Sequence, residues 1–227
     1  MKIIECEKMD ILNSHVTFIR VEPEDLSKAI EDILHVLSDL SWIADFDQEY
    51  IRMSFEKRAK DTATYLAGSL KMEKKDKVTS NTGEYIVSEM AKEAIASRLK
   101  YKDIPLAELF KEQVIGNPGF DYYSLNGNNI IIFGEAKYLA DQNAYGNGMK
   151  QVARFIKEKQ DISDLNDIDK FFEPSSLSNA SKGEKAYSIA FSSKKTPSKN
   201  IISGILQNKY YNELVTHKEI IYVAVNV

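Results

Sequence analysis

An apolar run at residues 130–133 ends in two charged side chains, and this combination limits what the surrounding chain can fold into. The run reads Ile-Ile-Ile-Phe and is followed by Gly-Glu-Ala-Lys, so a strand suited to a protein core delivers Glu135 and Lys137 at its end. Side chains two residues apart on a strand point to the same face, which places these two side by side. The polar segment at 126–129 predicts a hairpin that sets Asp121 opposite or nearly opposite Glu135.

Two carboxylates and a lysine at the edge of a buried sheet predict a bound cation. Unpaired charge is costly to bury, and a divalent cation is a natural partner for such a cluster. Asp121 and Glu135 offer hard oxygen ligands, and the carbonyl of Ala136 offers a third. A Mg²⁺ ion held there with open coordination positions suits phosphodiester hydrolysis, because it activates water and neutralises charge that builds up on phosphorus. Lys137 is placed to orient the water and to stabilise the transition state.

A Glu-x-Lys spacing alone occurs by chance in most proteins and indicates little. The apolar strand before it, the hairpin, and the Gly-Phe-Asp segment at 119–121 on the partner strand together favour a functional site over a chance pairing. Other chemistries have weaker signals. His15, His35 and His217 are scattered without metal-ligand spacing, and the chain has no phosphate-cradling Gly-x-x-x-x-Gly-Lys.

Length and composition bound the classes of protein that remain. The chain has 227 residues, of which 43% are hydrophobic and 28% charged, which suits one domain with an appended segment or two small domains. No apolar run approaches the length needed to cross a bilayer, and residues 1–10 lack the apolar core of a signal peptide. A single cysteine, Cys6, excludes an intrachain disulfide and fits a reducing compartment. We therefore expect a cytoplasmic protein with no membrane partner.

The charge balance gives a mixed signal about nucleic acid. The net charge is −4 and the sequence pI is near 5.6, whereas a dedicated DNA-binding domain usually carries a strong basic excess. Five lysines nevertheless crowd a polar stretch that contains Glu184 as its one acid; they are Lys182, Lys185, Lys194, Lys195 and Lys199. This cluster predicts either a solvated loop or phosphate contacts near an active site.

Hydrophobic patterning predicts an α/β (α+β) fold in two parts. Residues 1–77 read as a ββαα module that could dock a partner, with a half-buried strand at 15–21. Residues 78–227 read as α-β-β-α-β-α-β, a mixed sheet flanked by helices, although the two parts could share a core. The elements expected in this second part are a helix at 83–99, a strand or irregular segment at 104–114, the hairpin, a helix at 149–159, a strand at 186–192, a helix at 201–214 and a strand at 220–227.

These residues resemble the PD-(D/E)xK nuclease superfamily, which includes many restriction endonucleases. The resemblance implies a restriction-endonuclease-like α-β-β-β-α-β core, dependence on Mg²⁺ or Mn²⁺, and cleavage of DNA. By position, Asp121 and Glu135 resemble the metal-binding acids, and Lys137 resembles the catalytic lysine. Glu84, in the preceding helix, resembles a further acidic residue of the metal site. Gln151 resembles a glutamine that follows in the next helix, although this chain has Phe155 where the branches with that glutamine place a tyrosine.

A narrower resemblance is to the nuclease subunit of the Hachiman anti-phage defence system. It is carried by the Thr-Gly-Glu helix start at 82–84, the hairpin and the closing apolar strand at 220–225. This resemblance implies a helicase partner. Two alternatives stay open: a nuclease-like fold that binds nucleic acid or a protein without cutting, and a structural subunit whose N-terminal helices dock another protein.

Overall fold

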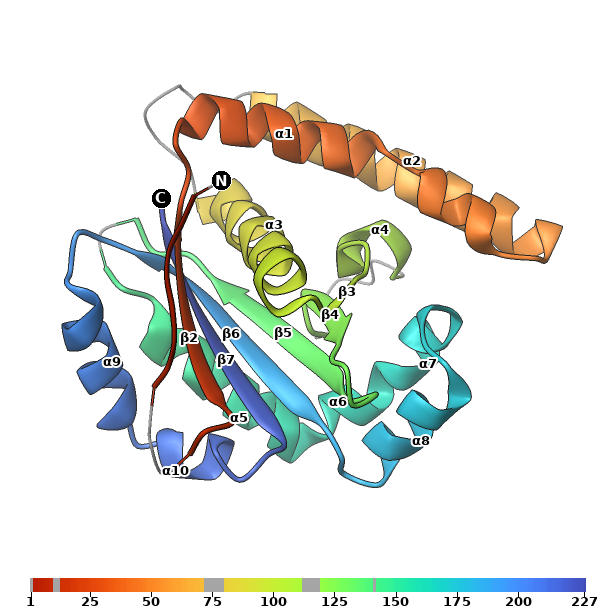
Figure 1. The fold of residues 1–227 in the computed structure, drawn as a ribbon. Coiled ribbons are helices and arrows are strands. Elements are labelled where there is room, and N and C mark those ends of the chain that lie inside the picture. Colours follow the sequence, from red (N-terminus) through yellow and green to blue (C-terminus); the bar gives the residue numbers. More distant parts are fainter. Residues whose placement is uncertain (1, 10–12, 72–79, 112–118, 141) are drawn as a thin grey trace.

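The computed structural model describes residues 2–9, 13–71, 80–111, 119–140 and 142–227; the boundary expected between residues 77 and 78 lies outside them. At the centre of these residues is one seven-stranded mixed sheet with strand order β1-β2-β7-β6-β5-β4-β3 (Figure 1). Its strands are β1 (Lys2–Lys8), β2 (Val16–Glu22), β3 (Lys102–Asp103), β4 (Tyr122–Leu125), β5 (Ile131–Lys137), β6 (Ala186–Ser193) and β7 (Glu219–Asn226).

Helices cover both faces of this sheet. Helix α3 packs against β4 to β7 on one face, and α5 packs against β5 and β6 on the other (Figure 1). The helices are α1 (Leu26–Ser38), η1 (Ser41–Asp45), α2 (Glu49–Lys71), α3 (Ser80–Leu99), α4 (Ala107–Phe110), α5 (Tyr145–Glu158), α6 (Gln160–Ser163), α7 (Leu165–Ile168), η2 (Asp169–Phe171), α8 (Pro174–Ser181), α9 (Ser198–Leu206) and α10 (Tyr211–Leu214). None of the described helices is both long and apolar enough to span a membrane.

The centre of the sheet is parallel, because β2, β7, β6 and β5 pair in that order with the same direction. The outer pairs, β1 with β2 and β4 with β3 and β5, are antiparallel. Parallel strands covered on both faces read as continuous apolar runs, and β6 is buried at every position. The strand expected at 15–21 is present as β2, but the prediction that it is half-buried is wrong, since β2 is buried from Val16 to Val21.

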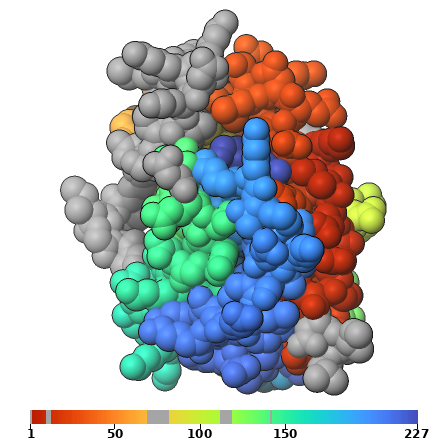
Figure 2. Space-filling model, turned by 90° about the vertical axis from the view of Figure 1, so that its left-hand side faces the viewer, coloured from red at the N-terminus to blue at the C-terminus, as the bar shows by residue number. Residues whose placement is uncertain are grey.

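The N-terminal residues belong to the same sheet as the rest of the chain. β2 pairs in parallel with β7, with Val16 opposite Ile220 and Val21 opposite Val225. On the face shown in Figure 2, the red N-terminal segments lie directly beside blue C-terminal ones. Helices α1 and α2 pack against each other and cross one end of the molecule above α3 (Figure 1). The described residues on the two sides of the expected boundary therefore share one sheet and one core.

Two expected elements take a different form. The segment at 104–114 holds the four-residue helix α4, preceded by the two-residue strand β3. The polar stretch 161–182, for which no element was expected, folds into short helices. The helix expected at 201–214 is broken between α9 and α10 by Asn208, whose side-chain oxygen accepts a hydrogen bond from the N–H of Tyr210 at 3.0 Å. An asparagine that bonds its own backbone two residues on competes with helical bonding.

Candidate functional site

The β4–β5 hairpin sets the two predicted carboxylates on facing positions. Tyr122 pairs with Gly134, so the next position on each strand carries Asp121 and Glu135. The register is fixed at the turn, where the side-chain oxygen of Asn126 accepts hydrogen bonds from the N–H groups of Asn128 and Ile130. The predicted hairpin and the predicted placement of Asp121 opposite Glu135 are both confirmed.

Backbone bonds hold Asp121 at the end of β5. Its N–H donates to the carbonyl of Gly134 at 2.8 Å, and its Oδ2 accepts from the N–H of Ala136 at 2.7 Å. Gly134 is required here, because a Cβ at this position would lie 2.2 Å from the ring of Tyr122. The tyrosine ring therefore covers the strand just before Glu135, and its hydroxyl bonds Ser188 on β6 at 2.7 Å.

Lys137 links the end of β5 to helix α3. Its Nζ lies 2.9 Å from Oε1 of Glu135 and 3.1 Å from Oε1 of Glu84. Helix α3 approaches closely at Gly83, where a Cβ would lie 2.2 Å from the ring of Tyr138. The Glu84 side chain is 43% exposed and that of Glu135 is 1% exposed, so the cluster opens to solvent on the α3 side.

The carboxylate of Glu135 is buried without a hydrogen-bond partner. Neither of its oxygens has a hydrogen-bond partner among the described residues, and the ammonium of Lys137 lies 2.9 Å from Oε1. Burial raises the pKa of Glu135 well above its usual value, and repulsion from Asp121 raises it further. A buried anion in this condition favours either a proton or a cation as its partner.

The neighbouring charges respond to the same crowding. Burial raises the pKa of Asp121 to about 6, although attraction to Lys137 and the bond from the N–H of Ala136 act in the opposite direction. Burial alone would lower the pKa of Lys137, but Glu135, Asp121 and Glu84 outweigh it and raise that pKa. Lys137 therefore carries a full positive charge at neutral pH. It faces carboxylates whose ionised form is disfavoured by burial.

Glu108 is a further acid of this cluster that the sequence did not single out. It lies on α4, whose first N–H, from Ala107, donates to the backbone carbonyl of Asp121 at 3.0 Å. Its Oε2 is buried and has no hydrogen-bond partner among the described residues. Burial, and next the charge of Asp121, raise the pKa of Glu108 to about 8. The one sequence signal was a lone acid among the apolar residues 106–110.

Gln151 lies on α5, the helix that packs against β5. This residue is half-buried on α5 and makes no hydrogen bond to the clustered side chains within the part of the chain that is described. Ala136 is fully buried, and its N–H is already bonded to Asp121. Its expected contribution through the carbonyl stays a prediction, as does the role of Gln151.

The fit to a metal ion is partial. Among the described residues, no group of three or more Asp, Glu, His or Cys side chains is arranged to hold a metal. Glu84, one of the expected ligands, instead contacts Lys137. Asp121 and Glu135 still suit Mg²⁺, which is commonly held by one or two carboxylates and completes its shell with water and substrate phosphate. The oxygens of Glu135 accept no hydrogen bond from the described residues and suit such an ion beside Lys137.

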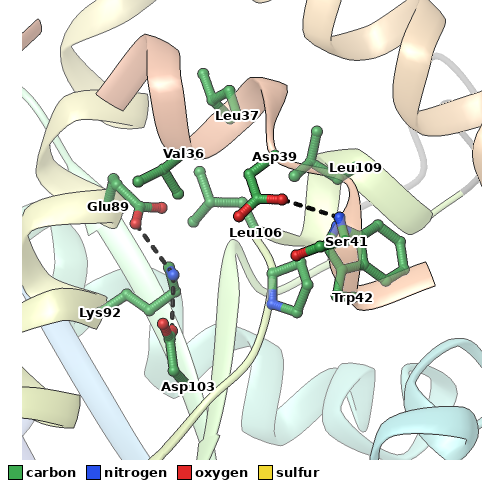
Figure 3. Close-up of a pocket in the computed structure, with 11 residues that line it drawn as sticks. Val36, Leu37, Asp39, Ser41, Trp42, Glu89, Lys92, Asp103, Leu106 and Leu109 are labelled. Atoms are coloured by element: carbon green, nitrogen blue, oxygen red, sulfur yellow. Dashed lines mark hydrogen bonds and ion pairs between the residues drawn. The ribbon is translucent and has the colours of Figure 1, made fainter. Parts of the chain in front are cut away.

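A second polar cluster borders a cavity on another side of α3 (Figure 3). The cavity has a volume of about 290 Å³ and lies between α1, α3 and the segment that leads into α4. At one end, Nζ of Lys92 lies 3.0 Å from Glu89 and 2.7 Å from Asp103. Lys92 is thus paired on two sides, and this arrangement fits a structural ion cluster better than a reactive one.

Comparison of the chain with protein-family models, with curated proteins and with solved structures finds no match. The function is therefore argued from the geometry at the end of β5. That geometry gathers Asp121, Glu135 and Lys137, adds Glu84 from α3, and brings Glu108 close from α4.

Proposed function

We propose that this chain is a metal-dependent DNA nuclease of the PD-(D/E)xK type, which hydrolyses phosphodiester bonds. One observation carries the proposal: Glu135 is 1% exposed, its two oxygens have no hydrogen-bond partner among the described residues, and Asp121 and Lys137 flank it. A buried acid whose oxygens accept no hydrogen bond, beside a second buried acid and a lysine, is typical of a functional site.

Each side chain has a separate task in this proposal. Asp121 and Glu135, with the carbonyl of Ala136, would hold Mg²⁺ or Mn²⁺, which when bound supplies an activated water and neutralises phosphate charge. Asp121 is positioned for this by the N–H of Ala136 and needs no other side chain to set its direction. Lys137 stays protonated because three acids surround it, and its ammonium can donate to a phosphate oxygen in the transition state. Glu84 holds that ammonium from the solvent side.

The order of elements supports the proposal. With the short helices α4, α6, α7, η2 and α8 left aside, the elements α3, β3, β4, β5, α5 and β6 follow the helix, three strands, helix and strand that the resemblance to the nuclease superfamily implies. A role in anti-phage defence with a helicase partner rests on the narrower resemblance alone.

The experiment compares three forms of the protein on plasmid and linear DNA with Mn²⁺ or Mg²⁺. We expect metal-dependent cleavage by the unmodified chain, loss of cleavage in Lys137→Met, and full cleavage in the control Lys150→Met, which alters an exposed lysine on α5. Unchanged cleavage in Lys137→Met would overturn the assignment. Because a partner could hold the enzyme inactive, Mn²⁺ binding is also measured by calorimetry on the unmodified chain and on Glu135→Gln, and it should be lost in that variant.

The alternative is a catalytically silent subunit that binds nucleic acid or a protein. It is favoured by the absence, among the described residues, of a three-carboxylate metal group. Under this alternative the chain would retain DNA in EDTA, bind no Mn²⁺ at Glu135, and give no cleavage product with any metal.

A further inference from the structure

The loops that follow β5 and β6 are fastened together beside the candidate site. β5 and β6 are parallel neighbours, and Lys137 at the end of β5 is paired with Phe191. Beyond that pair, the N–H of Leu139 donates to Oγ of Ser192 at 2.9 Å. Asn143 then bridges the loops, since its Oδ1 accepts from the N–H of Lys194 at 3.1 Å, and its Nδ2 donates to Thr196 at 3.1 Å.

A buried arginine fixes the second of these loops from the other side. Arg20 on β2 is 7% exposed. Its guanidinium donates to the carbonyls of Lys194 and Thr196 at 2.9 and 2.7 Å, and to Oγ of Ser198 at 3.1 Å. The segment 194–199, which includes the first two residues of α9 and which we call the lysine loop, is therefore held in a set position at the edge of the sheet where Lys137 lies.

The structure separates the five lysines that the sequence had grouped together. Lys182 and Lys185 lie before β6, at the opposite end of the strand from Lys137, and Lys185 is paired there with Asp161. Lys195 and Lys199 are exposed on the lysine loop and have no acidic partner among the described residues. In Figure 2 the light-blue segment that follows β6 lies next to the green segment that follows β5.

We propose that the lysine loop binds the phosphate backbone of the DNA strand that enters the candidate site; this inference rests on the proposed function. The cluster itself sets the acids Glu84, Asp121 and Glu135 against one lysine, so it repels a polyanion. Positive charge must therefore come from nearby surface if DNA is to be held there. Exposed, unpaired lysines on a fixed loop suit phosphate contacts, which gain free energy by releasing counterions.

The test measures DNA binding by fluorescence anisotropy in EDTA, over a range of salt concentrations. The variant Lys195→Glu/Lys199→Glu is compared with the control Lys182→Glu/Lys209→Glu, which makes the same change in net charge with exposed lysines at the opposite end of β6 and between α9 and α10. We expect the loop variant to bind more weakly and to lower the slope of log K against log salt by roughly 2, since two phosphate contacts are lost. The control should keep a slope close to that of the unmodified chain.

Several outcomes would overturn the inference: equal losses in both variants, no loss in the loop variant, or no DNA binding by the unmodified chain. If the loop variant bound DNA normally but lost a protein partner, the loop would be a protein-binding surface instead. Lys195→Gln/Lys199→Gln serves as a milder pair should the glutamates disturb folding, and Lys195→Arg/Lys199→Arg should bind normally. Mn²⁺ binding at Glu135 is independent of this loop, so failure here would leave the proposed nuclease site to be judged separately.

Discussion

The carboxylate of Asp121 accepts a hydrogen bond from the backbone N–H of Ala136, across the β4–β5 hairpin, at 2.7 Å. A carboxylate that would hold a metal is thus oriented by the main chain of the strand that carries the second carboxylate. Its direction follows from the strand register and does not depend on the rotamer of another side chain. Because one oxygen is bonded in this way, Oδ1 is the atom of Asp121 that is left for a ligand.

A divalent cation should stabilise the protein through Glu135. At roughly 100 times its dissociation constant, Mn²⁺ would add about 2.7 kcal/mol to the free energy of unfolding and raise Tm by roughly 5–10 °C. In Glu135→Gln this rise should largely disappear, whereas Glu93→Gln, an exposed position on the same helix as Glu84, should keep it. Differential scanning fluorimetry with and without Mn²⁺ measures both.

The same variant gives a second readout in the absence of metal. Glu135→Gln removes a carboxylate whose burial outweighs its attraction to Lys137, so at about pH 8 the variant should unfold at a higher temperature than the unmodified chain. A destabilised Glu135→Gln that still responds fully to Mn²⁺ would show that this residue has a structural role only.

The metal-free protein should lose stability as the pH rises. Asp121 and Glu108 have ordinary pKa values of 3.8 and 4.5, which the fold raises to about 6 and about 8. Since both pKa values are raised in the folded state, the folded protein binds more protons than the unfolded chain at pH values between the ordinary and the raised pKa of each group. The resulting stabilisation is complete below about pH 4 and is lost as the pH passes through the raised values. Tm should fall between about pH 5 and pH 8.5.

Glu108 should account for the upper part of this pH dependence. In Glu108→Gln, the fall in Tm between about pH 7 and pH 8.5 should be smaller, because the group with the pKa of about 8 is gone. Mn²⁺ competes with protons for carboxylates, so its effect on Tm should grow as the pH rises. An unchanged upper limb of the profile in Glu108→Gln would place Glu108 outside the coupled cluster.

Lys92 should be essential for stability. The free energy of unfolding lost in Lys92→Met should depend on pH. Lys92 and Glu89 are both buried, and burial raises the pKa of Glu89 even though Lys92 opposes that effect. Lys92→Met leaves Glu89 buried without its cation, which should cost about 3–5 kcal/mol at about pH 8. Because the pKa of Glu89 then rises further, protonation at about pH 5 should restore part of the loss.

Urea unfolding at the two pH values measures this effect. Lys92→Met/Glu89→Gln is the matched control, since it removes both charges and should recover much of the stability of the unmodified chain. Asp103→Asn should cost little, because the Asp103 side chain is 61% exposed. If Lys92→Met lost the same free energy of unfolding at both pH values, the loss would not come from the unpaired charge of Glu89.

The sequence predicted the hairpin and its carboxylates because their signals are local. The asparagine-rich turn fixes the register over a few residues, and the period of two along a strand then decides which side chains face each other. Glu108 could not be found in this way. Its helix has four residues, too few for a periodic pattern, and its approach to Asp121 depends on a backbone bond between segments that the sequence does not show to be close.

Local sequence patterns also could not predict where the N-terminal strands lie in the sheet. Patterning indicated a strand near Val16 but not its neighbour, since the residues that bury it come from β7, at the other end of the described chain. Arg20 illustrates the same limit. It lies in the strand that was expected to be half-buried, yet its guanidinium is buried and bonded to the lysine loop.

The pairing of β2 with β7 has a consequence for how the protein is made. Val16 pairs with Ile220, so the β1–β2 hairpin leaves the ribosome long before its neighbour in the sheet exists. At ordinary rates of synthesis, this delay lasts roughly 10–40 s, during which the inner edge of β2 stays open to wrong partners. Pairings so distant in sequence also slow folding itself. Chaperone dependence during translation is therefore expected to be concentrated on the N-terminal hairpin, far from the residues proposed to cut DNA.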